Sequence, residues 1–199
     1  AGIPYAAVNV LMTTLHYRHA ATADHCRRVA DLCVAAATGI LSNEDCYLLE
    51  MAALLHDIGK LGVPDAILLK PGPLSTDEWQ TIKSYKVIGE ELIAVAFSSK
   101  RLSEIIRSLH YRFDGDSNKK NMPKGEELLL EARILAVADA FDSMVSDQVY
   151  RKGRSQDDAF KELQRHAGSQ FDPHVVEVFI QRIMERNQNR IRTDAAKAE

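Results

Sequence analysis

The sequence has little cysteine and no long hydrophobic run. The chain of 199 residues contains three cysteines, an odd number. Cys26, Cys33 and Cys46 match no spacing that is typical of disulfide pairs or of cysteine metal sites. We therefore interpret all three as small core residues in a reducing compartment, which predicts a cytoplasmic protein. No apolar run is long enough to predict a membrane segment, and the N-terminus lacks the charged start and apolar centre of a signal peptide.

Internal repeats, low-complexity stretches and the alternating pattern of β-strands are also missing. The formal net charge is only −3, which disfavours a protein that coats a nucleic-acid polymer but is compatible with a basic pocket for one phosphate ligand. With 46% hydrophobic and 27% charged residues, the composition is that of an ordinary globular protein. A chain of this length favours one domain with a sizeable core.

Apolar residues recur at intervals of three and four, which is the pattern of amphipathic helices. The sequence predicts an all-α fold with helices over residues 20–39, 43–57, 75–83, 85–97, 100–111, 131–146, 154–167 and 173–187. Ser75 and Ser155 are the expected caps of two of these helices. Gly59 is expected to end the helix that carries His56 by adopting a left-handed conformation.

Four polar side chains interrupt apolar helix faces. His25 continues the stripe of Val29 one turn upstream, His56 and Asp57 end a continuous apolar run, and Asp139 lies inside another. Burying an unpaired carboxylate costs several kcal/mol, so a cationic partner is expected. A divalent metal ion would compensate all four residues at once, since histidine nitrogen and aspartate oxygen suit such ions. Separate local pairing of each residue is the alternative.

Four blocks resemble, in order, those of the HD-GYP domain: HCRRVADLC, AALLHDIGKLGVPDAILLKPGPLSTDEW, EARILAVADAFDSMVSDQVYRK and GSQFDPHVVEVFIQRI. The resemblance covers roughly residues 20 to 187. It implies an all-α HD-superfamily bundle of about seven to eight helices and metal-dependent hydrolysis of cyclic di-GMP. The expected organisation is a linker or N-terminal helix over 1–19, the HD-GYP-like domain over 20–187 and a polar tail over 188–199.

The resemblance also assigns roles to individual residues. It implies that one primary site holds a divalent metal ion (Fe, Mn, Ni, Co or Zn; one ion, or two) through His25, His56, Asp57 and Asp139. Lys60 and Arg151 match residues that face the substrate phosphate in the family. The alternatives are a solvated lysine just past a helix end and a surface arginine near Asp147. Asp142, one turn after Asp139, is expected to support the site by bonding the backbone or a nearby arginine. His110 has three open roles: a residual ligand, a general acid or a structural residue.

The sequence also departs from the family pattern. The family's glutamate one turn before the first histidine is Ala21, a further expected histidine is Tyr85, and Leu109 replaces the partner of His110. Tyr111 stands where the family has a glutamate, and the Gly-Tyr-Pro signature is absent, replaced by DSNKKNMPK. These changes remove most ligands of the second and third metal positions of the family while leaving the first complete.

Three functions are therefore compatible with the sequence. The first is a phosphodiesterase that hydrolyses a cyclic dinucleotide with a reduced metal site. The second is a binding or regulatory module that has lost catalysis, and the third is a mononuclear phosphomonoesterase acting on nucleotides. We expect a sensor or receiver domain before residue 1 in the full-length protein. The apolar positions of the first helix could pair with a second copy in a homodimer or cap the domain's own core.

Overall fold

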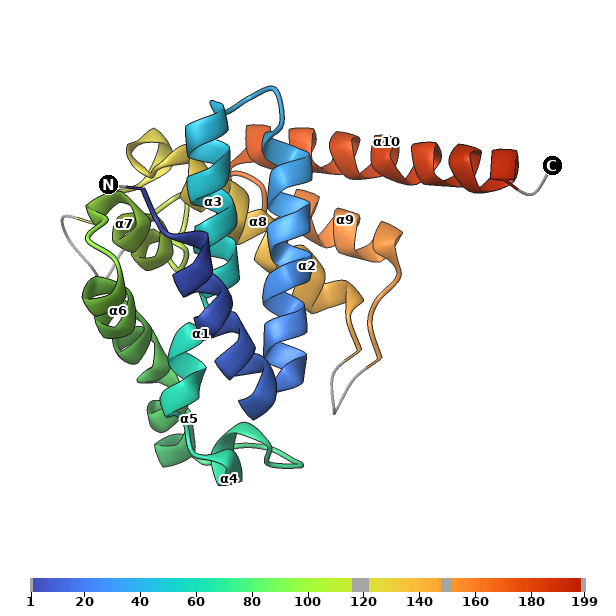
Figure 1. Ribbon diagram of the computed structural model, residues 1–199. Coiled ribbons are helices and arrows are strands. Elements are labelled where there is room, and N and C mark those ends of the chain that lie inside the picture. Colours follow the sequence, from blue (N-terminus) through green and yellow to red (C-terminus); the bar gives the residue numbers. More distant parts are fainter. Residues whose placement is uncertain (1, 116–121, 148–151, 198–199) are drawn as a thin grey trace.

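Each regular element of the computed structural model is a helix, in agreement with the all-α prediction (Figure 1). The structure describes residues 2–115, 122–147 and 152–197. Two of its elements are short 3₁₀ helices, named η1 and η2. The elements are α1 (Tyr5–Arg18), α2 (Ala20–Ala37), α3 (Asn43–Leu55), η1 (Ile58–Gly62), α4 (Asp65–Leu68), α5 (Thr76–Lys83), α6 (Tyr85–Ala96), α7 (Lys100–Ser108), η2 (Gly125–Glu127), α8 (Leu130–Val145), α9 (Gln156–Arg165) and α10 (Pro173–Lys197).

Helix α2 lies at the centre of the core, between α3 and α8. Its buried face includes Val29, Cys26 and Cys33, all without exposed surface. The side chains of Val8 and Leu15 on α1 are equally buried and pack into the same core, so this helix caps the domain's own core. Within the parts of the chain that the structure describes, no helix combines the length and apolar character needed to span a bilayer.

The predicted helix caps at the two serines are confirmed, but the prediction for Gly59 is wrong. The Ser75 and Ser155 hydroxyls accept hydrogen bonds from backbone N–H groups three residues later, at 3.2 and 3.1 Å. Gly59 instead lies within η1 and is not among the glycines with positive φ. A Cβ atom at Gly59 would collide with the carbonyl oxygen of Tyr85 and lie 2.6 Å from the backbone nitrogen of Gly89. Glycine is needed there because η1 and α6 approach closely.

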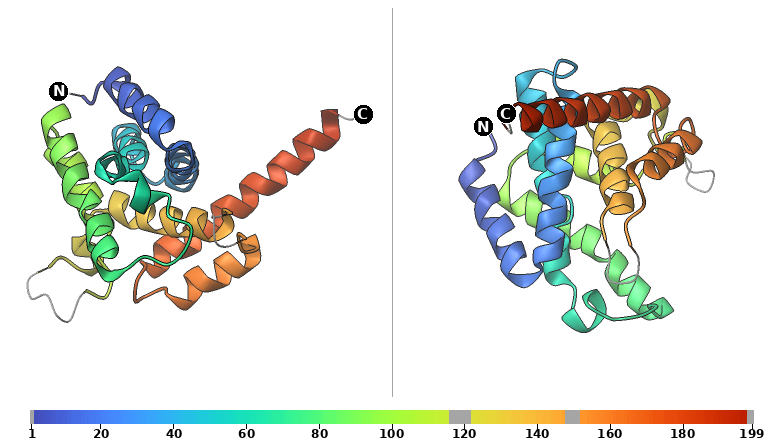
Figure 2. Two further views of the ribbon diagram at one scale, coloured as in Figure 1. Left: turned by 90° about the horizontal axis from the view of Figure 1, so that it is seen from below. Right: turned by 90° about the vertical axis from the view of Figure 1, so that its right-hand side faces the viewer.

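Helix α10 is ten residues longer than the predicted end at residue 187. Its first half buries Val176, Phe179 and Ile183 against the core. The carboxylate of Asp172 accepts the backbone N–H of His174 at 2.8 Å and so satisfies one free donor at the start of the helix. The C-terminal part projects away from the helical body, as Figure 1 and the left view of Figure 2 show. The expected polar tail is therefore helical as far as residue 197.

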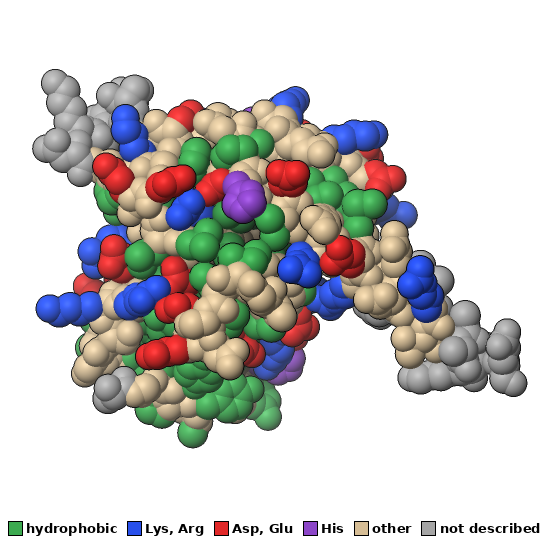
Figure 3. Space-filling model, turned by 90° about the horizontal axis from the view of Figure 1, so that it is seen from above, with side chains coloured by type: hydrophobic (Ala, Val, Ile, Leu, Met, Phe, Trp, Pro, Cys, Tyr) green, Lys and Arg blue, Asp and Glu red, His purple; other side chains and the backbone are tan. Residues whose placement is uncertain are grey.

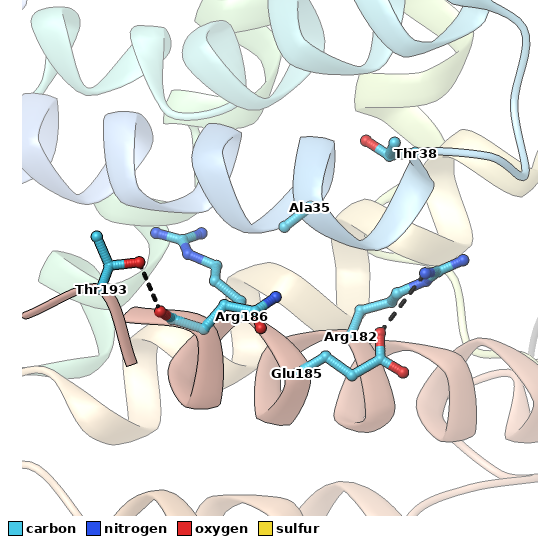
Figure 4. A pocket seen from close by; sticks show the side chains of 7 residues that line it. Ala35, Thr38, Arg182, Glu185, Arg186 and Thr193 are labelled. Atoms are coloured by element: carbon cyan, nitrogen blue, oxygen red, sulfur yellow. Dashed lines mark hydrogen bonds and ion pairs between the residues drawn. The ribbon is translucent and has the colours of Figure 1, made fainter. Parts of the chain in front are cut away.

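The molecular surface shows no concentration of one charge on the face drawn in Figure 3, where acidic and basic side chains are interspersed. A shallow pocket between α2 and α10 is lined by Ala35, Thr38, Arg182 and Glu185, among others (Figure 4). Arg182 forms an ion pair with Glu185 at 3.6 Å. None of the predicted metal ligands lines this pocket.

A buried carboxylate outside the predicted site forms an ion pair that is expected to stabilise the fold. Glu131 on α8 is 1% exposed and accepts hydrogen bonds from the guanidinium of Arg101 on α7. Replacing Arg101 with alanine leaves this carboxylate buried without its cation, so we expect a loss of about 2 kcal/mol in unfolding free energy, moderated by the half-exposed arginine. Urea unfolding measures the loss. The control is Arg107→Ala on the same helix, whose partner Glu90 is only partly buried. Equal losses for the two variants would contradict the prediction.

Candidate metal centre

Three elements bring the predicted ligands together. Helix α2 contributes His25 from its buried face, and α8 contributes Asp139 from the side that packs on α2. His56 is the C-cap of α3, and Asp57 follows where the backbone turns into η1. Because α3 ends at this point, both side chains enter the space between α2 and α8. The helix positions that the sequence placed on apolar faces therefore converge.

The imidazole of His25 is held from both sides by carboxylates. Its Nε2 lies 3.0 Å from Asp139 Oδ1, and its Nδ1 lies 2.7 Å from Asp142 Oδ2. Arg28 donates two hydrogen bonds to Asp142, at 2.8 and 2.9 Å. Burial opposes the charged form of His25, but the bonds to Asp139 and Asp142 outweigh it and raise its pKa. The expectation that Asp142 bonds a nearby arginine is confirmed, and the structure adds its bond to His25.

His56 presents an unused nitrogen to the centre of the cluster. Its Nδ1 donates to the carbonyl oxygen of Ala53 at 2.7 Å, which leaves Nε2 as the free ring nitrogen. Among the described side chains, Nε2 is the one fully buried polar atom without a hydrogen-bond partner. It lies 3.6 Å from Asp139 Oδ1 and 3.8 Å from Asp57 Oδ2. A buried ring nitrogen surrounded by carboxylates is suited to holding a cation.

The carboxylates of the cluster stay ionised in spite of their burial. Burial opposes ionisation of Asp139, but its hydrogen bond to His25 and the nearby charge of His56 hold its pKa well below the ordinary value. Burial likewise raises the pKa of Asp57, and the charges of His56 and Lys60 more than reverse that effect. The ammonium of Lys60 lies 2.6 Å from Asp57 Oδ2. The site thus keeps two negative charges available for a metal ion.

Two groups of side chains have the spacing of metal ligands. The ligand atoms of His25, His56 and Asp139 all lie within 4.8 Å of one another, and the same is true of those of Cys26, His56 and Asp57. Three of the four predicted ligands therefore form one group, and Asp57 joins it through the shared His56. Nitrogen and carboxylate donors of this kind fit a first-row divalent ion.

Sequence reasoning did not identify Cys26 as a member of the cluster. We interpreted this residue as part of the core, which its complete burial supports. Its nearness to His56 and Asp57 depends on how α2 packs against α3, a contact that no local pattern reveals. The sequence feature that could have identified Cys26 is its position directly after His25, because consecutive helix residues point to neighbouring faces of the helix.

His110 lies just beyond α7 and belongs to neither ligand group. Part of its surface is exposed, but the surrounding protein desolvates the ring, and the charge of Lys86 adds to this effect, which lowers the pKa of His110 to about 4. Its imidazole is therefore neutral at pH 7. Of its three open roles, this disfavours the general acid and leaves the residual ligand and the structural residue.

The sequence also indicates Arg151, as a phosphate-binding residue, and Tyr85, as the replacement of a histidine. Arg151 lies outside the described residues, so its role in phosphate binding stays a prediction. Tyr85, which replaces an expected histidine, lies at the start of α6 with its ring 5.5 Å from the ammonium of Lys60. Burial, followed by the charges of Asp57 and Asp139, raises the pKa of Tyr85, so its hydroxyl keeps its proton. A neutral phenol here is a weaker metal ligand than the histidine that it replaces.

Comparison with known proteins agrees with this fold. A family model described as an HD domain matches residues 9–175. The chain is 35% identical to the cyclic di-GMP phosphodiesterase response regulator RpfG of Xanthomonas campestris, over 85% of this chain and 46% of that protein. It is 38% identical to a cyclic di-GMP phosphodiesterase of Thermotoga maritima, over 66% of this chain and 36% of that protein. The chain thus spans less than half the length of these curated relatives.

A solved structure shares the fold. Bd1817, an HDG"Y"P protein from Bdellovibrio bacteriovorus, superposes with a TM-score of 0.63 and 20% sequence identity, over 80% of this chain and 51% of that one. The helical bundle and the cluster of histidines and aspartates define a helical domain that could hold a divalent metal. This chain belongs to the HD domain family.

Proposed function

We propose that this chain is the catalytic domain of a metal-dependent phosphodiesterase that hydrolyses cyclic di-GMP. The observation that carries the proposal is the convergence of His25, His56 and Asp139 around the unpartnered Nε2 of His56, with Asp57 beside it. The two relatives named above are cyclic di-GMP phosphodiesterases, which supports the same reaction class for this chain. RpfG is also a response regulator, which supports a receiver domain before this domain in the full-length protein.

Each residue of the site has a separate task. His25, His56, Asp57 and Asp139 would hold the metal ion, whose bound water is the nucleophile source in this chemistry. Asp142 fixes the orientation of His25, because it accepts the proton on Nδ1. Lys60 supplies a positive charge for a phosphate oxygen, and Arg151 is proposed to supply another. Iron, manganese, cobalt, nickel and zinc all suit these donors, and we propose a single ion.

A regulatory binding module is the second candidate, and one observation favours it. Tyr85 occupies the place of an expected metal-binding histidine, and its ring lies beside Lys60. Two metal ions stabilise the attacking and leaving oxygens of a phosphodiester together, and a single ion does so less completely. A domain with one ion could therefore bind cyclic di-GMP without cleaving it.

The deciding experiment measures hydrolysis of cyclic di-GMP by the purified chain, loaded separately with ferrous iron, manganese, nickel and zinc. Formation of the linear dinucleotide by the wild type but not by Asp139→Ala is the expected result. Metal uptake without turnover by any form would support the binding module and contradict the phosphodiesterase. Release of inorganic phosphate from nucleoside monophosphates, with cyclic di-GMP left intact, would instead identify a phosphomonoesterase.

A further inference from the structure

Cys26 is a buried thiol beside the metal centre. It follows His25 on α2 and has no exposed surface. Its Sγ, a nitrogen of His56 and a carboxylate oxygen of Asp57 all lie within 4.8 Å of one another. Thiolate sulfur, imidazole nitrogen and carboxylate oxygen are the donors that zinc uses in proteins. The thiol is therefore within reach of the same ion as the predicted ligands.

A second observation points to a binding site for a ligand next to this thiol. The Nε2 atom of His56 is buried without a hydrogen-bond partner, and the side chain of His56 is 2% exposed. It lies 3.8 Å from Asp57 Oδ2, inside the group that contains Cys26. Leaving such an atom unsatisfied is unfavourable, because it has lost its hydrogen bonds to water, so a partner for Nε2 is expected. A metal ion would satisfy this nitrogen and contact the sulfur as well.

The distances are compatible with coordination after a small adjustment. Donor atoms of a tetrahedral zinc site lie about 3.5 Å apart, given metal–ligand bonds of about 2.0–2.3 Å. The donors here are separated by at most 4.8 Å. Each side chain therefore needs to move by no more than about an ångström toward the ion.

Cys33 shows that burial alone does not produce this arrangement. It lies two turns later on the same helix and is equally buried. Among the described residues, however, it belongs to no group with the spacing of metal ligands. Cys33 is thus a core residue as the sequence predicts, whereas Cys26 is placed against two candidate ligands. The two cysteines form a matched pair for an experiment.

We propose that Cys26 is a ligand of the metal centre, with its sulfur completing a site formed with His56 and Asp57. The inference rests on the metal centre of the proposed function. On coordination the thiol releases its proton to solvent and binds as thiolate. A thiolate donor favours zinc, cobalt and ferrous iron, whereas oxygen and nitrogen donors alone also accommodate manganese. The sulfur therefore determines which metal the domain selects.

The test replaces the metal with cobalt(II) and records the absorption spectrum of the whole chain. Sulfur coordination produces an intense sulfur-to-cobalt charge-transfer band in the near ultraviolet, while weak visible bands report cobalt bound by any ligand set. We expect both in the wild type and in Cys33→Ala. In Cys26→Ser the ultraviolet band should disappear while visible bands remain. Zinc affinity should fall by at least about tenfold, because mutation of residues that merely support metal ligands already causes losses of this size. Manganese affinity should fall by less.

The possible outcomes distinguish a failure of this inference from a failure of the proposed function. Visible bands without the ultraviolet band in the wild type would show that cobalt binds without Cys26 and would overturn the inference alone, whatever the variants do. No cobalt binding would overturn both the inference and the metal centre. The ultraviolet band without hydrolysis of cyclic di-GMP would support the thiolate ligand and contradict the phosphodiesterase. Should Cys26→Ser fail to fold, Cys26→Ala serves in its place, and the wild-type spectrum still decides.

Discussion

Replacing Asp57 with asparagine should lower the rate of cyclic di-GMP hydrolysis by at least about a hundredfold, the loss that follows removal of one group that stabilises charge at a reacting centre. Asparagine keeps the size of the side chain but removes its negative charge. The carboxylate of Asp57 lies 3.8 Å from His56 Nε2 and 2.6 Å from the ammonium of Lys60. Without it, the cluster keeps its imidazoles but loses one of the two carboxylates that we assign to the metal.

Metal content distinguishes the reasons for such a loss. Metal bound per chain, measured by atomic absorption after dialysis, should fall in Asp57→Asn together with the rate. The matched control is Asp24→Asn, since Asp24 is half-exposed on α2, one residue before His25, and pairs with the exposed Arg27. This control should keep the metal content and rate of the wild type. If the Asp57→Asn protein were fully active, Asp57 would not be a metal ligand and the mechanism proposed above would be wrong.

The location of the site could be predicted because its ligands interrupt regular patterns. A polar residue on an apolar helix face can be recognised from periodicity alone, as His25 was beside Val29 and Asp139 was within its apolar run. The block resemblance then grouped these positions with His56 and Asp57, and the structure places them together. Local pattern and tertiary arrangement agree here because His25 and Asp139 lie on helix faces and His56 and Asp57 lie directly at the end of a helix.

Features that depend on contacts between helices could not be predicted in the same way. Gly59 was expected to adopt a left-handed conformation, but it allows the backbone of Tyr85 to approach η1. Glu131 is buried because Arg101, on another helix, pairs with it. The continuation of α10 beyond residue 187 lacks an apolar stripe of its own, so periodicity gave no indication of helix there. For Gly59 and Glu131 the information lies in a distant part of the chain.

The pairing of Lys60 with Asp57 also has a consequence for substrate binding. The sequence resemblance assigns Lys60 to the substrate phosphate, and in the structure its ammonium lies 2.6 Å from the Asp57 carboxylate. Burial opposes its charge, but Asp57 holds the pKa of Lys60 above its ordinary value, so the side chain is charged at neutral pH. A phosphate and a metal ion would divide this pair between them, with the lysine facing the phosphate and the aspartate facing the metal. The pair thus stabilises the cluster before either ligand binds.

Replacing Asp142 with alanine should lower the unfolding free energy of the metal-free protein by about 3 kcal/mol and weaken metal binding by about ten- to hundredfold. Asp142 is 2% exposed and bonds both His25 and Arg28. Its removal leaves His25 without the acceptor that orients its ring. Arg28 is half-exposed and can return to water, so the loss of stability stays at the lower end for a buried ion pair. Urea unfolding and zinc titration measure the two effects.

The structural and metal-binding roles of Asp142 can be separated with two further variants. Asp142→Asn keeps an acceptor for His25 Nδ1 but loses the charge that pairs with Arg28, so it should recover most of the metal affinity and less of the stability. Arg28→Ala removes the cation and leaves the bond to His25 in place, so metal affinity should again change little. Asp24→Ala, at an exposed position on α2, should change stability by less than about 0.5 kcal/mol. If Asp142→Ala bound zinc as tightly as the wild type, the orientation of His25 would not depend on Asp142, and the ring would have to be held by Asp139 and the metal alone.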